Sequence, residues 1–152
     1  MRVITGSARG KRLVTVPGND IVRPTSEKVK EALFSSIQFD IEGRRVLDLF
    51  AGSGQLGIEA LSRGAESAVF VDRSDDSLGA VRKNLENTGL TDKAEVYKSD
   101  YATFALRYSK QFDIAFLDPP YKAGLLEDAV QKIIPLMSDY GKIFCEHPCE
   151  LK

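Results

Sequence analysis

The sequence has no long hydrophobic run, and this absence excludes whole classes of protein. No uncharged stretch approaches the length of a membrane-spanning helix, and the N-terminus, MRVITGSARGKRL, lacks the apolar core of a targeting segment. Internal repeats and low-complexity tracts are missing as well. Hydrophobic residues make up 43% and charged residues 28% of the 152 positions, which is typical of a folded domain. We therefore expect one compact, monomeric, cytoplasmic unit without a membrane partner.

Cysteine and histidine are also scarce. The two cysteines, Cys145 and Cys149, lie so close together that a disulfide between them would close a very short loop and add little stability. We expect free thiols in a reducing compartment. The single histidine, His147, lies between them, but a structural zinc site needs four ligands and the sequence holds no fourth Cys or His. We predict no metal site, and packing at a strand end as the role of this segment.

Neither sign of charge is in excess over the whole chain, whose net charge is −1. The balance hides an asymmetry, because the first thirty residues hold seven basic and two acidic side chains, a net charge of +5 that the other residues offset with −6. The phosphates of a nucleic acid can therefore be bound at one end of the chain only. A charged hairpin that simply faces solvent is the alternative.

The first forty residues predict a small extension that precedes the main fold. Residues 2–5 and 11–16 are β-prone runs separated by glycine and serine, which indicates a hairpin with a charged tip. Pro17-Gly18-Asn19-Asp20 then ends the second run. A helix capped by Thr25 or Ser26 follows, and its buried face is expected to carry Val29, Leu33 and Ile37.

From Arg44 onward the pattern changes to that of an α/β core. Apolar runs alternate with amphipathic helices, as in parallel βαβ units. One helix is expected over about 75–86, with Gly89 as its stop signal, and ligands of such a sheet bind beyond the carboxyl ends of its strands. The predicted strands are 45–50, 68–72, 94–98, 112–117 and 141–146, and a last helix carries Leu126, Ala129, Val130, Ile133 and Met137.

A glycine motif follows the first predicted strand, in Asp48-Leu-Phe-Ala-Gly52-Ser-Gly54-Gln-Leu-Gly57. Glycines at this strand-to-helix turn let the backbone approach a ligand, although by themselves they can also serve only the turn. Asp72 ends the second strand, twenty residues after Gly52, where a carboxylate can accept both hydroxyls of a ribose. The alternative for Asp72 is an ordinary surface-loop residue.

Two further carboxylates belong to the same predicted edge. Asp100 follows the third strand and can accept from an adenine amino group, or cap the helix that follows, and the two roles can coexist. Asp48 lies inside the last turn of the first strand, where it suits a cationic aminoacyl sulfonium better than a pyrophosphate. The alternative for Asp48 is a buried hydrogen-bonding role that ties loops together.

The fourth strand ends in Asp118-Pro119-Pro120-Tyr121. Two prolines make a rigid, extended loop, which would fix the Asp118 carboxylate and the Pro119 carbonyl while Tyr121 presents a flat face to a base. If both N–H bonds of a base amine point at these two acceptors, the nitrogen lone pair turns toward a methyl donor. A plain surface turn is the alternative.

The whole chain resembles the RsmD family of 16S ribosomal RNA guanine-N2 methyltransferases. The resemblance is carried by RVITGSARGKRL, RPTSEKVKEALF, LDLFAGSGQLGIEAL, LDPPY and FCEH. It implies a class I S-adenosylmethionine-dependent methyltransferase fold, Rossmann-like, with residues 1–40 as an RNA-binding extension of the core at 41–152. Family members usually continue into a further helix and an antiparallel strand pair, so we expect an exposed edge beside the fifth strand and an abbreviated C-terminal part.

The resemblance also implies a role for individual residues. The partner would be 16S rRNA, within a 30S subunit or an assembly intermediate, and the catalytic loop would run from Asp118 to Tyr121. The implied contacts to S-adenosyl-L-methionine are Asp48, Phe50, Gly52, Ser53, Gly54, Asp72, Arg73, Asp100 and Tyr101, and the implied contacts to RNA are Arg2, Arg9, Lys11, Arg12 and Arg23.

Three alternatives stay open at this point. The same catalytic loop serves adenine-N6 methylation of DNA or RNA, and the choice of guanine comes from the resemblance alone. A nucleotide-binding oxidoreductase would use the same ribose carboxylate, but the sequence offers no hydride-transfer site. A non-catalytic RNA-binding module with this fold is the third alternative, which the intact Asp-Pro-Pro-Tyr does not favour.

Overall fold

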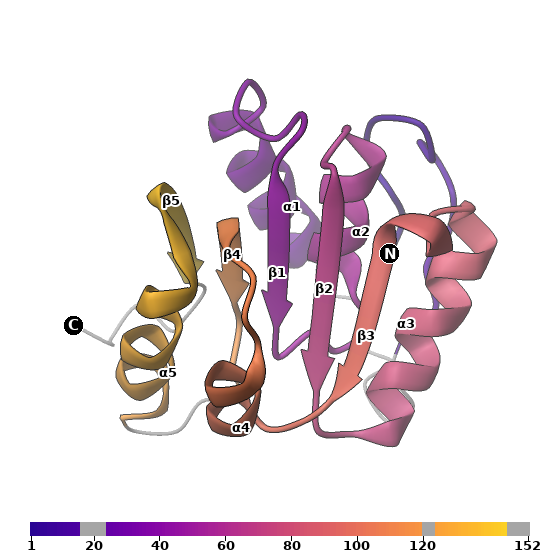
Figure 1. Ribbon diagram of the computed structural model, residues 1–152. Coiled ribbons are helices and arrows are strands. Elements are labelled where there is room, and N and C mark those ends of the chain that lie inside the picture. Colours follow the sequence, from indigo (N-terminus) through magenta and orange to yellow (C-terminus); the bar gives the residue numbers. More distant parts are fainter. Residues whose placement is uncertain (16–23, 120–123, 146–152) are drawn as a thin grey trace.

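A computed structural model of the chain describes residues 1–15, 24–119 and 124–145 (Figure 1). Helices and strands alternate after a short N-terminal segment. The helices are α1 (Pro24–Ser36), α2 (Gln55–Ser62), α3 (Asp75–Thr88), α4 (Tyr101–Arg107) and α5 (Leu125–Ile133). The strands are β1 (Arg45–Leu49), β2 (Ser67–Asp72), β3 (Ala94–Lys98), β4 (Phe112–Leu117) and β5 (Met137–Cys145), and short 3-10 turns precede β3 and β5.

The five strands form one parallel sheet in the order β3-β2-β1-β4-β5, which confirms the predicted α/β core. The order reverses between β1 and β4, where an open sheet of this kind has its switch point. Among the described strands β5 lies at one edge and β3 at the other. All carboxyl ends point the same way, toward the lower side of Figure 1.

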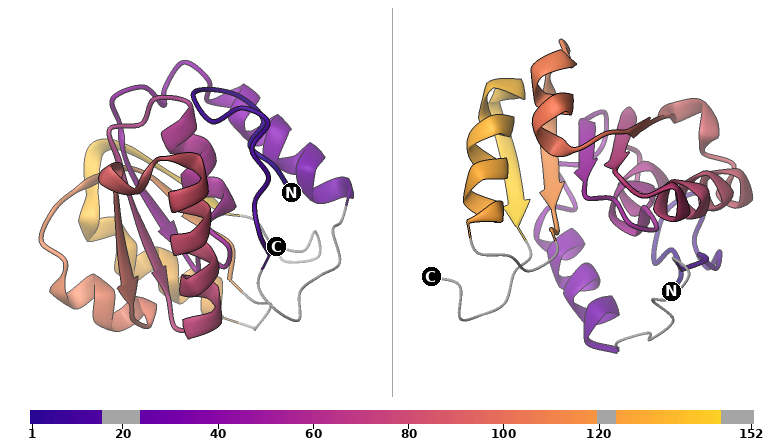
Figure 2. Two further views of the ribbon diagram at one scale, coloured as in Figure 1. Left: turned by 90° about the vertical axis from the view of Figure 1, so that its right-hand side faces the viewer. Right: turned by 90° about the horizontal axis from the view of Figure 1, so that it is seen from below.

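Helices cover both faces of the sheet (Figure 2). We call the face covered by α1, α2 and α3 the α2 face, and the face covered by α4 and α5 the α5 face. Successive strand residues alternate between the faces, so in β1 Val46 packs on the α2 face while Leu47 and Leu49 pack on the α5 face. The central strands are buried on both sides, which explains their almost continuous apolar sequence.

The N-terminal segment packs on the α2 face as an open hairpin. The sequence predicts two regular strands at residues 2–5 and 11–16, of which residue 16 lies outside the described residues. One antiparallel bridge, between Arg2 and Arg12, stands in their place. The Val3 N–H donates to the Lys11 carbonyl at 2.9 Å and the Leu13 N–H to the Met1 carbonyl at 3.0 Å. The two runs are therefore antiparallel, as a hairpin requires. Contacts of side chains, rather than a regular series of backbone hydrogen bonds between strands, hold the segment in its position.

Two details of the predicted helices are wrong. Val29 is 45% exposed, and the buried face of α1 instead carries Lys30 and Phe34, because the Lys30 ammonium finds partners in the interior. Ile37, just after the helix, is buried as predicted. Met137 does not belong to the last helix but begins β5. Pro135 lies in the 3-10 turn before it and has no N–H to continue an α-helix.

The search for a possible membrane span covered residues 1–15, 24–119 and 124–145. No helix in these ranges is both long and apolar enough to cross a bilayer.

Candidate functional site

The loops after β1, β2, β3 and β4 meet at the carboxyl edge of the sheet, where the sequence placed the site (Figure 1). The first loop leaves β1 through Phe50, whose φ of 62° is positive although the residue is not glycine. Gly52 and Gly54 continue with φ of 58° and 81°, which only glycine adopts readily. A non-glycine residue held in this region is strained, and such strain gathers at functional sites.

Asp72 holds the glycine loop from the end of β2. Its Oδ2 accepts a hydrogen bond from the Gly52 N–H at 3.0 Å, and its Oδ1 accepts from the Ser74 N–H at 2.9 Å. The side chain is half-buried. Each carboxylate oxygen has a second lone-pair direction, so Asp72 can hold the loop and still accept from two ligand hydroxyls.

Asp48 lies beneath the same loop, inside the α2 face. It is buried, and its Oδ2 accepts from the Gly57 N–H at 2.9 Å, which joins the end of β1 to α2. A Cβ on Gly57 would lie 2.4 Å from the Phe70 ring, so glycine is required for this close approach. The buried tying role that the sequence left open for Asp48 is therefore present.

The charges around Asp48 show which groups converge at this edge. The pKa of Asp48 is raised to about 8, mainly by burial, which the Gly57 hydrogen bond opposes and to which the charges of Asp118 and Asp72 add. The acidic side chains after β2 and β4 thus lie close enough to act on Asp48 at the end of β1. A cation would relieve their repulsion, whereas a pyrophosphate would add to it.

Asp100 and Tyr101 begin α4 at the neighbouring loop. Asp100 is the N-cap, because its carboxylate accepts from the Thr103 N–H at 2.8 Å and from the Thr103 hydroxyl at 2.9 Å. These bonds hold the pKa of Asp100 below its ordinary value. The Tyr101 ring packs 5.6 Å from the Phe50 ring, and its hydroxyl donates to Asp128 of α5 at 2.5 Å. The capping role of Asp100 is therefore present, and contact with an adenine stays a prediction.

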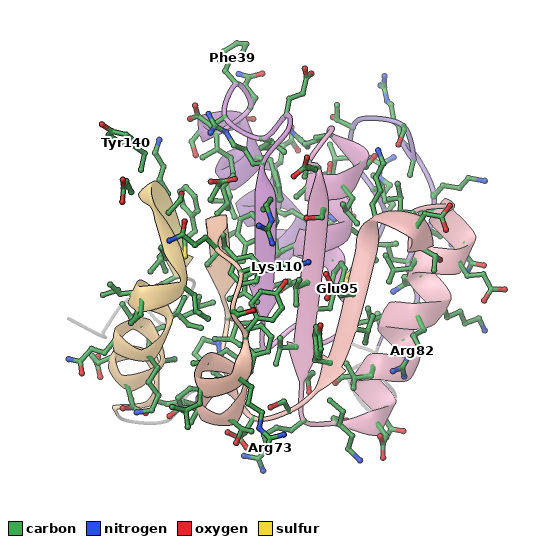
Figure 3. The ribbon with its side chains drawn as sticks, viewed as in Figure 1. Phe39, Arg73, Arg82, Glu95, Lys110 and Tyr140 are labelled. Carbon is green, nitrogen blue, oxygen red and sulfur yellow. The ribbon has the colours of Figure 1, made fainter. Side chains whose placement is uncertain are left out.

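Asp118 and Pro119 follow β4 directly, at the same edge as the glycine loop. Asp118 is exposed and Pro119 half-buried. Arg73 is exposed and lies beyond the end of β2, at the lower side of Figure 3. Ser53 is buried within the glycine loop. Pro120, Tyr121, Arg23, His147 and Cys149 lie outside the described residues, so the predictions on them stay predictions.

The basic residues of the N-terminal segment lie away from the core. Arg2, Arg9, Lys11 and Arg12 are exposed. Lys30 is one of the seven basic side chains of the first thirty residues, but it is buried. Its Nζ donates to the Arg2 carbonyl at 2.8 Å and lies 3.6 Å from Glu59 Oε1. Burial lowers the pKa of Lys30, and Glu59 opposes this effect. Lys30 is therefore a structural residue and not a phosphate contact.

Sequence reasoning missed two buried polar residues that hold this segment, Glu59 and Asn84. The Glu59 carboxylate accepts from the Ile4 N–H at 2.8 Å, the Thr5 N–H at 3.1 Å and Arg63 Nε at 2.8 Å. The Asn84 side chain is bonded to Val14. Both residues lie on the apolar faces of their helices, and a polar residue at such a position is the signal that could have found them.

A cleft of about 550 Å³ lies at the opposite end of the sheet, around the amino ends of β4 and β5. Asp113 accepts there from the Arg45 N–H at 3.0 Å and from the Ser138 hydroxyl at 2.9 Å. Phe39 and Tyr140 are strongly exposed near this end, at the upper side of Figure 3. Asp113 is thus used within the protein, and Asp40 of the same lining lies 3.4 Å from Lys142, so the carboxyl edge remains the better candidate.

The chain is similar to known proteins over its full length. The family model described as Conserved hypothetical protein 95 matches residues 1–152. The putative rRNA methyltransferase YlbH of Bacillus subtilis is 43% identical over 100% of this chain and 85% of its own length. Ribosomal RNA small subunit methyltransferase D of Escherichia coli K12 is 37% identical over 93% of this chain and 68% of its own length.

Solved structures agree with the sequence matches. The structure described as putative methyltransferase yhhF from Escherichia coli superposes with a TM-score of 0.88 at 34% identity, covering 100% of this chain and 84% of that one. The putative methylase HI0767 of Haemophilus influenzae gives a TM-score of 0.75 at 31% identity, covering 97% and 84%. The predicted methyltransferase fold is thereby confirmed.

Proposed function

The chain belongs to the family described as Conserved hypothetical protein 95, the RsmD family, and from this premise we propose that it methylates ribosomal RNA with S-adenosyl-L-methionine as the methyl donor. The observation that carries the proposal is the convergence of Asp48, Asp72 and Asp118 beside a strained glycine loop. This edge favours a cationic ligand with a ribose over a nicotinamide dinucleotide, whose pyrophosphate the carboxylates of Asp72 and Asp118 would repel.

The residues present fit the proposed donor, which supplies an electrophilic methyl group on a sulfonium cation. Asp72 would accept from the ribose hydroxyls, and the backbone at Gly52 to Gly54 would approach the ligand closely. Asp100 and Tyr101 would border the adenine. Phe50, Ser53 and Arg73 complete the proposed set. Asp48 is already bonded to Gly57, and a cation bound nearby would favour its ionised form, because opposite charges attract.

The chemical step would depend on acceptors at the end of β4. A base amine is a poor nucleophile because its lone pair is delocalised into the ring. We expect the Asp118 carboxylate and the Pro119 carbonyl to accept its two N–H bonds, which frees the lone pair for in-line attack. Pro120 would keep the loop rigid, and Tyr121 would stack on the base, a contact worth about 1–3 kcal/mol. The proton can leave to Asp118 or to water.

We propose guanine N2 of 16S rRNA as the acceptor. The name of the E. coli relative supports a small subunit rRNA as substrate, and the choice of guanine N2 rests on the resemblance to the RsmD family. Residues 1–40 would be the RNA-binding extension, with Arg2, Arg9, Lys11, Arg12 and Arg23 as its phosphate contacts. A 30S subunit or assembly intermediate would be the natural substrate, and the protein would act as a monomer in the cytoplasm.

Methylation assays with radiolabelled S-adenosylmethionine on naked 16S rRNA, 30S particles and duplex DNA test this proposal. We expect incorporation into rRNA, and nucleoside mass spectrometry should identify N2-methylguanosine. Transfer to DNA adenine alone would overturn the substrate. Calorimetry with S-adenosylhomocysteine and NADH tests the cofactor separately, and tight NADH binding without binding of the homocysteine nucleoside would overturn it.

A further inference from the structure

One buried side chain joins the N-terminal segment to the glycine loop. Asn84 lies on α3 and is completely buried. Its Oδ1 accepts from the Val14 N–H at 2.7 Å, and its Nδ2 donates to the Val14 carbonyl at 3.0 Å. The same Nδ2 donates its second proton to the Ser53 carbonyl, also at 3.0 Å. A single carboxamide therefore bridges two segments that are not otherwise neighbours in sequence.

The bonds of Asn84 use both of its N–H donors and one lone pair of its oxygen. Because Asn84 is fully buried, water has no access to the three backbone groups that it binds unless a cavity opens. These groups therefore depend on the Asn84 side chain for their hydrogen bonds. Shortening Asn84 would leave the Val14 N–H, the Val14 carbonyl and the Ser53 carbonyl without this partner. Each loss in the interior is costly, so Asn84 constrains both segments at once.

On the loop side, Asn84 fixes the peptide at the centre of the glycine motif. Asp72 holds the Gly52 N–H at 3.0 Å, and the Ala51 carbonyl holds the Gly54 N–H at 2.8 Å. Asn84 holds the Ser53 carbonyl between them. The two flanking glycines give this loop little rigidity of its own, so its orientation depends on these outside contacts.

On the other side, Val14 lies two residues after Arg12 in the segment that carries the exposed basic residues. The segment is held in place along its length, because Ile4 and Thr5 are bonded to the buried Glu59 and the Leu13 N–H is bonded to the Met1 carbonyl. The Ser62 hydroxyl adds bonds to the Ala8 N–H and the Thr5 carbonyl. A displacement of the basic residues by bound RNA would therefore also displace Val14, because the backbone between them has little freedom to adjust.

We propose that Asn84 is a positioning residue that couples RNA binding at the N-terminal segment to cofactor binding at the glycine loop. This inference rests on the proposed function of both segments. By linkage the coupling is reciprocal, so the cofactor tightens RNA binding by the same factor as RNA tightens cofactor binding. Such couplings typically amount to about 5–150-fold.

The coupling is measured as the ratio of two dissociation constants for in-vitro transcribed 16S rRNA, without and with saturating S-adenosylhomocysteine. We expect a ratio of about fivefold or more for the wild-type protein. Asn84→Ala should reduce it below about twofold, while each ligand still binds alone. Asn87→Ala is the matched control, because Asn87 lies on the same helix with its side chain exposed, and it should keep the wild-type ratio.

An undiminished ratio in folded Asn84→Ala would overturn the inference. Wild-type protein that binds both ligands without coupling would overturn it too, and would leave the proposed function standing. Wild-type protein that binds neither S-adenosylhomocysteine nor 16S rRNA would overturn the proposed function together with the inference.

A second measurement needs no variant and covers the case in which Asn84→Ala fails to fold. S-adenosylhomocysteine should slow hydrogen exchange of the Val14 amide, which is bonded to Asn84, more than exchange of the Val3 amide, which is bonded to Lys11. Equal slowing of the two amides would indicate general stabilisation only and would contradict the coupling.

Discussion

The two faces of the sheet are built in different ways. Seven polar or charged residues of the described ranges are buried, and they come from α1, α2, α3, β1 and the glycine loop, on or next to the α2 face. The α5 face is apolar, with an aromatic series in which the Phe104 and Tyr108 rings lie 4.9 Å apart and the Tyr108 and Phe112 rings 5.1 Å apart. The face that positions the candidate RNA segment is thus held by specific partners, and the other by shape and area.

Glu59→Gln is the strongest test of this difference between the α2 face and the α5 face. The change keeps the volume but removes the negative charge that faces Lys30, and it places an amide N–H₂ against backbone donors. We expect the free energy of unfolding to fall by about 3–5 kcal/mol, the cost of breaking a buried ion pair. Urea denaturation measures it, with Glu31→Gln on the exposed side of α1 as the control. A loss below about 1 kcal/mol would remove the distinction between the faces.

Asp118→Ala tests whether methyl transfer takes place at the carboxyl edge of the sheet rather than on one of its two faces. We expect kcat for rRNA methylation to fall about a hundredfold or more, because one acceptor of the amine is lost. Affinity for S-adenosylhomocysteine should change by less than about twofold. Asp139→Ala, an exposed aspartate of β5 at the other end of the sheet, serves as control. Equal losses of turnover and cofactor affinity would contradict the orienting role.

Combined replacement of Arg9, Lys11 and Arg12 by alanine tests whether the N-terminal segment binds RNA through side chains that do not contribute to its packing on the α2 face. These side chains are exposed, so stability should stay within about 0.5 kcal/mol. RNA binding should weaken, and the slope of its logarithm against the logarithm of salt concentration should drop by about 2–3. A filter-binding titration at several salt concentrations measures this. An unchanged slope would exclude these residues from the interface.

Asp48 adds a pH dependence to the α2 face. Its pKa is raised to about 8 in the folded protein, mainly by burial. The protonated side chain therefore makes its full contribution to stability below the pKa of the unfolded chain, about 4. Stability should therefore decline as pH rises from about 4 through 8, because the buried carboxyl must ionise. Thermal unfolding across this range measures the decline, which Asp48→Asn should reduce. A wild-type profile matched by Asp48→Asn throughout would contradict the assignment.

The smallest effect is expected on the α5 face. Leu136→Met conserves volume at a buried apolar position, so the unfolding free energy should change by less than about 1.5 kcal/mol. Leu106→Met, at a residue that is 88% exposed on α4, is the control and should change nothing measurable. Circular dichroism melts compare the two. A loss as large as that of Glu59→Gln would show that both faces require equally specific contacts.

Much of the site could be read from the sequence because its residues follow the ends of strands. Apolar runs located all five strands, and parallel strands necessarily bring the residues after their carboxyl ends together. Asp72, Asp100 and Asp118 are therefore where the sequence placed them. The N-cap role of Asp100 was among the two roles predicted for it, whereas the strained φ of Phe50 was not readable, since it depends on backbone geometry at a single residue.

The sequence by itself determined the alternation of strands and helices, the parallel sheet and the positions of the acidic residues after the strands, because these depend on local periodicity and on the order of short motifs. Tertiary structure alone decided that Lys30 is buried and Val29 exposed, that Glu59 binds the backbone of residues 4 and 5, and that Asn84 joins Val14 to Ser53. The physical reason is that a buried polar group needs partners, and here those partners lie up to 70 residues away in the chain.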